Sequence, residues 1–139
     1  MVTSGLCLPA KRRADVTRYL ISFAAKAMDH IPEADMPVVG RAAHAVLQEA
    51  VDAGVWVFGA GMDGSPASIV GTDGQVSDGP APESLGGFAI VDVPSRDEAL
   101  RWASKIAVAC RCAQEVWQLQ PDPEQDLQVE EGRAAKQQA

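Results

Sequence analysis

The sequence predicts an α+β fold with one antiparallel sheet and two helices on one face of that sheet. Three observations carry this prediction: the order of the predicted elements is β-α-β-β-β-α-β, both helical segments are amphipathic, and 139 residues with 47% hydrophobic composition suffice for one core. This order is close to the split-βαβ, ferredoxin-like plan with an additional hairpin strand, βαβ(β)βαβ. We therefore expect a ferredoxin-like domain.

The first strand and the first helix come from the first third of the chain. Residues 17–24, TRYLISFA, are rich in β-formers and predict a buried strand. After a polar loop, apolar residues recur at helical spacing from 38 to 53. Asp35 is a candidate N-cap for this helix, and Gly54 is placed to end it in a left-handed conformation.

Three further strands follow this helix. Residues 55–58, VWVF, predict the second strand, and residues 67–71 predict a short third strand after an Asp-Gly-Ser-Pro turn. The sequence TDGQ at 72–75 is typical of a hairpin turn. Residues 85–93 alternate as a fourth strand, and Pro94 stops it.

A capping box opens the second helix. Ser95 is placed to accept a hydrogen bond from the amide of Glu98, whose side chain is expected to reach back. The helix continues as an amphipathic stripe to about residue 107, and residues 115–119 alternate as the last strand.

These elements divide the chain into three parts. Residues 1–16 form an N-terminal extension, residues 17–120 the folded domain, and residues 121–139 a flexible tail rich in acids and Gln. Two helices cover only one face of the sheet, so a second copy of the chain is expected to bury the other face. The predicted assembly is a homodimer of stacked sheets, similar to a dimeric α/β barrel.

Composition excludes several classes of function. Nineteen acidic and twelve basic residues give a net charge of −7, which disfavours nucleic-acid binding. No apolar run is long enough to cross a bilayer, and the N-terminus does not have the order of a signal peptide. Three cysteines in no zinc or redox spacing, with two histidines, predict no metal site, no cofactor and a reducing, cytoplasmic location.

The segment around residues 76–93 resembles a known family. Asp78-Gly79-Pro80, Glu83, the strand start Leu85-Gly86-Gly87-Phe88 and the downstream Ser95–Leu100 stand in the order found in the DGPF branch of the YCII-related superfamily. The family's Phe after Asp-Gly-Pro is Ala81 here, and the stretch after Glu83 is shorter than usual. The resemblance covers about residues 17–120 and implies a dimeric ferredoxin-like fold, with no established activity for most of the branch.

Two carboxylates in this segment are candidate catalytic groups. Asp78 precedes Gly-Pro, where it either forms the turn or acts as a proton-accepting carboxylate. Glu83 lies five residues later; it is either a solvated acid or the second member of a carboxylate pair with separated pKa values.

His44 is the third catalytic candidate. It lies on the first predicted helix beside the apolar stripe, and some YCII-like relatives pair a histidine in this region with an aspartate. A His-Asp pair fixes the imidazole tautomer and provides a base near neutral pH. The alternative is a structural or exposed histidine. Arg41, Gly61 and Pro80 are candidate ligand contacts: Arg41 by its charge one turn before His44, and Gly61 by the bare backbone at a strand end.

Three functions remain open. The first is a small-molecule acid/base enzyme, isomerase-like or lyase-like, that uses Asp78 and His44 on a small organic acid or ring compound. The second is a non-catalytic module that binds a small ligand. The third is a dimeric interaction protein that works with a transcriptional regulator, as the family's association with sigma factors implies.

Overall fold

The main body of the protein is a four-stranded antiparallel sheet with two helices packed against it. The structure is a computed structural model, and it describes residues 16–79 and 84–138. Its sheet has the order β2-β5-β1-β6, made by β2 (Trp56–Gly61), β5 (Leu85–Val93), β1 (Thr17–Ala24) and β6 (Glu115–Gln118). Every neighbouring pair is antiparallel. The predicted bounds of the first and fourth strands are confirmed at both ends.

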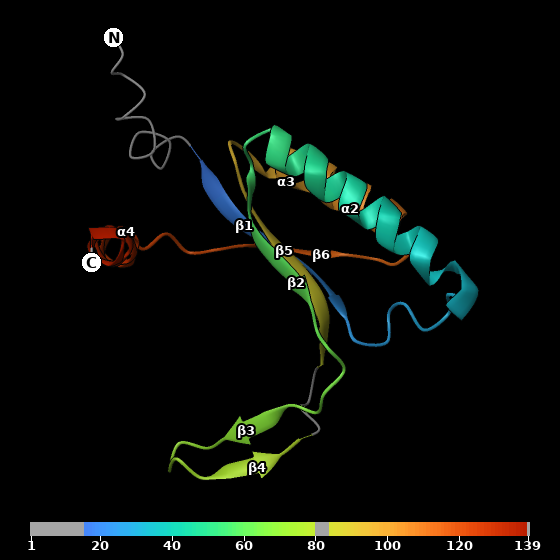
Figure 1. The fold of residues 1–139 in the computed structure, drawn as a ribbon, viewed down its shortest axis with the longest axis horizontal. Coiled ribbons are helices and arrows are strands. Elements are labelled where there is room, and N and C mark those ends of the chain that lie inside the picture. The colour runs from blue at the N-terminus through green and yellow to red at the C-terminus, as the bar shows by residue number, and fades with distance from the viewer. Residues whose placement is uncertain (1–15, 80–83, 139) are drawn as a thin grey trace.

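Helices α2 and α3 cover the same face of this sheet (Figure 1). Helix α2 (Met36–Asp52) follows a 3-10 turn, η2 (Glu33–Asp35), and helix α3 (Arg96–Cys110) follows β5. Gly54 has φ +76°, so the predicted left-handed end of α2 is confirmed. The amide of Glu98 donates to Ser95 Oγ at 3.2 Å, which confirms the first half of the predicted capping box.

Two predicted caps differ from the structure. Asp35 makes no side-chain cap on α2; its Oδ2 instead lies 3.0 Å from Nη1 of Arg111, at the end of α3. Glu98 does not reach back to Ser95, because its carboxylate pairs with Arg101 one turn later. In both cases an arginine competes with the backbone amide and attracts the carboxylate more strongly.

The hydrophobic core lies between the sheet and the two helices. On β1, Tyr19 and Ile21 face the helices, and their register partners on β5, Val91 and Ala89, lie on the same side. Ala99 and Ala103 of α3 are buried against this face. Small residues on the helix let it approach the sheet closely, and the period-2 alternation of each strand places the larger side chains beneath it.

Neither α2 nor α3 lies over the opposite face of the sheet (Figure 1). Trp117, Leu20, Ile90 and Phe58 are register neighbours across all four strands on this face. Phe58 and Trp117 are 58% and 56% exposed. The same face carries one ion pair, in which Arg18 Nε lies 2.7 Å from Oδ1 of the buried Asp92. The carboxylate raises the pKa of Arg18 above its ordinary value, chiefly through the hydrogen bond. We call this surface, with its row of four apolar residues, the open face.

A hairpin stands apart from the main sheet (Figure 1). It consists of β3 (Ser68–Val70) and β4 (Val76–Asp78), which pair only with each other as a two-stranded sheet. The predicted third strand and the Asp-Gly turn are confirmed, with Gly74 at φ +83° and Asp73 Oδ1 accepting from the amide of Gln75 at 2.9 Å. Strand β4 was not predicted, because its three residues are too short for alternation to be recognised.

The C-terminal segment is helical rather than irregular. Helix α4 runs from Pro123 to Gln138, where composition predicted a flexible tail. The lack of large apolar residues suggested disorder, but Gln, Glu, Ala, Arg and Lys are all strong helix formers. Asp122 also accepts a hydrogen bond from the amide of Gln125 at 3.1 Å, at the start of the helix. Within the described ranges, no helix is both long enough and apolar enough to cross a membrane.

Candidate small-molecule pocket

A cavity of about 380 Å³ lies between helix α2 and the sheet. Its floor is the end of the sheet where strands β2 and β5 carry Gly59, Gly61, Gly87 and Ala89. Register places these four residues on the helix-facing side, beside Ile21 and Phe23 of β1. The cavity is open above Gly61, where an added Cβ would meet no atom closer than 4.0 Å, whereas the rings of Trp56 and Phe23 occupy the space at Gly59 and Gly87.

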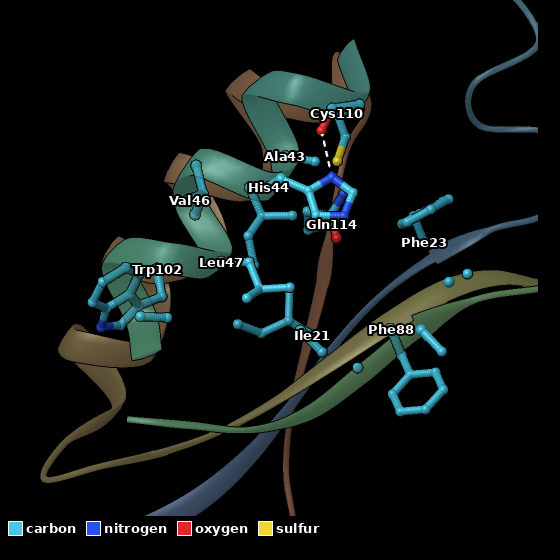
Figure 2. A pocket seen from close by; sticks show the side chains of 18 of the residues that line it. Ile21, Phe23, Ala43, His44, Val46, Leu47, Phe88, Trp102, Cys110 and Gln114 are labelled. Atoms are coloured by element: carbon cyan, nitrogen blue, oxygen red, sulfur yellow. Dashed lines mark hydrogen bonds between the residues drawn. The ribbon is translucent and has the colours of Figure 1, made fainter. Parts of the chain in front are cut away.

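The walls of the cavity are largely apolar (Figure 2). Helix α2 contributes Ala43, Val46 and Leu47, and helix α3 contributes Trp102 and Ile106. Phe23 closes the side nearest the end of β1. The volume falls at the small end of the range of ligand sites in proteins, which are mostly apolar with few polar groups.

The double glycine at the start of β5 makes room for Phe23. A Cβ on Gly86 would lie 2.7 Å from the carbonyl oxygen of Ala24 and 2.8 Å from the Phe23 ring. A Cβ on Gly87 would lie 2.8 Å from the tip of the same ring. Atoms this close overlap, so glycine at both positions is what allows the Phe23 wall to form.

His44 provides the first polar group in the cavity. It lies on α2, is exposed, and is one of the residues that line the cavity. Its Nδ1 lies 2.8 Å from the carbonyl oxygen of Gly40, one helical turn earlier, as the dashed line in Figure 2 marks. A carbonyl oxygen only accepts, so Nδ1 carries the proton and the neutral ring keeps an unprotonated Nε2.

Gln114 and Cys110 lie at the same end of the cavity as His44 (Figure 2). Gln114 Nε2 donates to the carbonyl oxygen of Cys112 at 3.3 Å and lies 3.5 Å from its Sγ. Burial raises the pKa of the Cys110 thiol, and nearby Cys112 raises it further. Cys110 is therefore a neutral thiol rather than a reactive thiolate. Neither residue was predicted as part of a site, because no motif or spacing in the sequence relates Cys110 or Gln114 to His44.

The predicted site residues are divided between this cavity and other places. His44 and Gly61 line the cavity. Arg41 is exposed on α2 and is not among the lining residues. Asp78 is exposed on β4 of the hairpin and does not line the cavity either, so the structure does not bring Asp78 to His44 within one chain.

The remaining candidates, Pro80 and Glu83, lie outside the described residues, as does most of the predicted extension, residues 1–15. Across residues 16–79 and 84–138, no cluster of three or more His, Cys, Asp or Glu side chains is placed to hold a metal ion.

Comparison with known families confirms the resemblance at the level of the YCII-related family, while the assignment to the DGPF branch stays a prediction. No curated protein is significantly similar to the chain. The YCII-related domain matches residues 25–117, which is more than half of the chain and runs from the end of β1 to β6. This range includes α2, the glycine-rich floor and the end of α3, so every wall of the cavity except that given by β1 comes from the matched part. The chain belongs to the YCII-related domain family.

Proposed function

We propose that the protein binds a small, largely apolar molecule in the cavity between α2 and the sheet, and that His44 acts there as a general base. The observation that supports this proposal most directly is the hydrogen bond from Nδ1 of His44 to Gly40, since it leaves Nε2 as a proton acceptor at the cavity. A neutral imidazole with one nitrogen anchored is the usual form of a catalytic histidine base.

The chemistry that fits such a site is proton abstraction from a bound molecule, as in an isomerase-like or lyase-like reaction. A base in a partly apolar cavity removes a proton from carbon or oxygen, and the resulting imidazolium can return that proton elsewhere. The anchoring carbonyl of Gly40 supports the ring as it becomes charged, which is the role that a carboxylate would otherwise have. The pairing of His44 with Asp78 remains a prediction.

The alternative is a binding module without turnover. The cavity itself, with apolar walls and a single imidazole, supports ligand binding whether or not a reaction follows. The two proposals differ in what they require of His44. An enzyme needs it as a base for turnover, whereas a binding module needs only the walls of the cavity.

A ligand screen by thermal shift, with two variants, tests the pocket. Gly61→Leu places a side chain on the floor, where the nearest atom to a new Cβ is Gly86 O at 4.0 Å, so the variant fills the cavity without straining the backbone. We expect ligands that raise the melting temperature of the wild type to have no effect on Gly61→Leu. Hits that stabilise both proteins equally would show that the cavity is not the binding site.

His44→Ala then separates the enzyme from the binding module. For an enzyme, we expect the wild type to convert a bound ligand and His44→Ala to bind it while turnover falls about 100-fold or more, the usual contribution of a general base. Turnover by His44→Ala at the wild-type rate would exclude His44 as the base.

We propose in addition that the domain is ferredoxin-like and that two copies stack through the open face. The order β2-β5-β1-β6, with antiparallel neighbours and both helices on one side, supports the first part. The exposed Phe58 and Trp117 support the second, because a soluble monomer rarely exposes a continuous row of large apolar groups. The same surface would serve a regulator-associated interaction module.

A further inference from the structure

We propose that the cavity selects a neutral ligand that presents hydrogen-bond donors, O–H or N–H groups, to His44 Nε2 and Gln114 Oε1. This inference rests on the proposed binding function and adds the chemical class of the ligand. It depends on which polar atoms at the cavity already form hydrogen bonds within the protein and which remain available to a ligand.

The protonation pattern of His44 is fixed by the helix to which it belongs. Nδ1 lies 2.8 Å from Gly40 O, and that oxygen can only accept. The neutral ring therefore has its hydrogen on Nδ1 and its lone pair on Nε2. A ligand group that meets Nε2 has to be a donor.

The same reasoning fixes the amide of Gln114. Its NH₂ group faces the carbonyl oxygen of Cys112 at 3.3 Å, because the reverse orientation would set two acceptors against each other. The amide oxygen Oε1 is then directed away from Cys112, and it has no hydrogen-bond partner among the described residues. Gln114 lines the cavity at the end where His44 lies (Figure 2), so this end presents two acceptors.

Anionic ligands do not fit this arrangement. Among the described residues that line the cavity there is no Lys or Arg, and the exposed Arg41 is not one of them. With the ring of His44 neutral, a carboxylate would meet two acceptors in an apolar cavity without a cation to balance its charge, and burying an unpaired charge is costly. The small organic acids considered from the sequence are thus disfavoured relative to neutral molecules.

Cationic ligands are disfavoured for the corresponding reason. No Asp or Glu lines the cavity among the residues that the structure describes, and Cys110 is held as a neutral thiol by burial. The match is an apolar molecule that carries one or two donors at one end, with the rest of its surface against the helix side chains and the glycine floor.

The test is a calorimetric titration with three probes of similar shape: indole, which has one N–H donor; benzofuran, which replaces that donor by an acceptor; and benzoate, an anion. We expect indole to bind the wild type about 2- to 12-fold more tightly than benzofuran, the range expected for one net hydrogen bond, and benzoate to bind more weakly than both. Benzofuran or benzoate binding as tightly as indole would overturn the donor inference.

Two variants separate this inference from the proposed function. Gly61→Leu is expected to abolish binding of all probes; unchanged binding would overturn the pocket itself. Gln114→Met keeps the length of the side chain and removes Oε1. We expect Gln114→Met or His44→Leu to reduce the preference for indole over benzofuran, whereas a purely structural role would weaken both probes equally.

A measurement without ligand tests the tautomer directly. Long-range ¹H–¹⁵N spectra of the imidazole rings, with His30→Gln to assign the second histidine, report which nitrogen carries the proton. We expect the Nδ1–H form at His44 near neutral pH. An Nε2–H ring would overturn the inference whatever the titrations show, and the absence of binding by every probe would overturn the inference together with the proposed pocket.

Discussion

At the scale of single residues, Arg111 shows two effects in opposition. It ends helix α3 with φ +58°, the left-handed conformation, and is the one non-glycine residue with positive φ in the described part of the chain. That backbone conformation costs a residue with a Cβ about 1 kcal/mol. Its guanidinium meets Asp35, but both side chains are close to half exposed, so the ion pair contributes at most about 1 kcal/mol.

Arg111→Gly should therefore leave stability unchanged or raise it by up to about 1 kcal/mol, because relief of the strained backbone offsets the lost ion pair. Urea unfolding of the wild type and the variant measures this difference. Asp35→Ala is the matched control: it removes the same ion pair and keeps the strain, so it should lower stability slightly. A loss above about 1 kcal/mol in Arg111→Gly would mean that the ion pair is stronger than exposed pairs usually are.

Some residues of the cavity could be predicted from the sequence and others could not. His44 was predicted because a helical period places it at the border of an apolar stripe, and Gly61 because it ends a strand. Gln114 was not predicted, because its role depends on how the end of α3 packs beside α2 and on a hydrogen bond to Cys112. Such tertiary relations leave no periodic signal in the sequence.

At the scale of elements, the sequence predicted correctly those helix ends and turns that depend only on residues close together in the chain. The Ser95 cap, the Gly54 helix end and the Asp73-Gly74 turn depend on neighbouring residues, and all three are confirmed. The pairing of β4 with β3 outside the main sheet and the helical form of residues 123–138 were not predicted. The separate hairpin depends on how two short strands pair with each other, which neither strand shows alone. The helix at 123–138 was missed because its composition is common to helices and to disordered tails.

The start of β5 gives a prediction at this scale. Gly86→Ala should destabilise the domain by about 1–3 kcal/mol, the usual cost of inserting a methyl group into packed space, because its Cβ would overlap the backbone oxygen of Ala24 and the ring of Phe23. Denaturant unfolding measures this loss. Gly61→Ala is the control on the neighbouring strand: its Cβ meets no atom closer than 4.0 Å, so stability should stay within about 0.5 kcal/mol of the wild type. Equal losses of stability in both variants would show that Gly86 is needed for the flexibility of the strand rather than to make room for the Phe23 ring.

At the scale of the whole molecule, the two faces of the sheet have different roles. The helix-facing side contains the core and the cavity, and its side chains are mostly buried. The open face combines the buried Asp92, paired with Arg18, with the apolar row whose two ends, Phe58 and Trp117, are exposed. The predicted order of elements indicated this division from the sequence, because two helices cover only one face of a sheet. The order of elements does not indicate which molecule covers the open face, so the homodimer remains a prediction.

Phe58→Arg tests the predicted dimer. Phe58 is 58% exposed on the open face, and its ring lies tilted against that of Phe88 with centroids 5.9 Å apart, so a charge there would be buried without a partner in a stacked dimer. We expect light scattering at micromolar concentration to give a dimer for the wild type and a monomer for Phe58→Arg, with dimerisation weakened about tenfold or more, equivalent to about 1.4 kcal/mol. Val108→Arg is the matched control, because Val108 is 78% exposed on α3, away from the open face, and the variant should stay dimeric. A monomeric wild type would contradict the prediction outright, and dissociation by Val108→Arg alone would move the interface from the open face of the sheet to the helices.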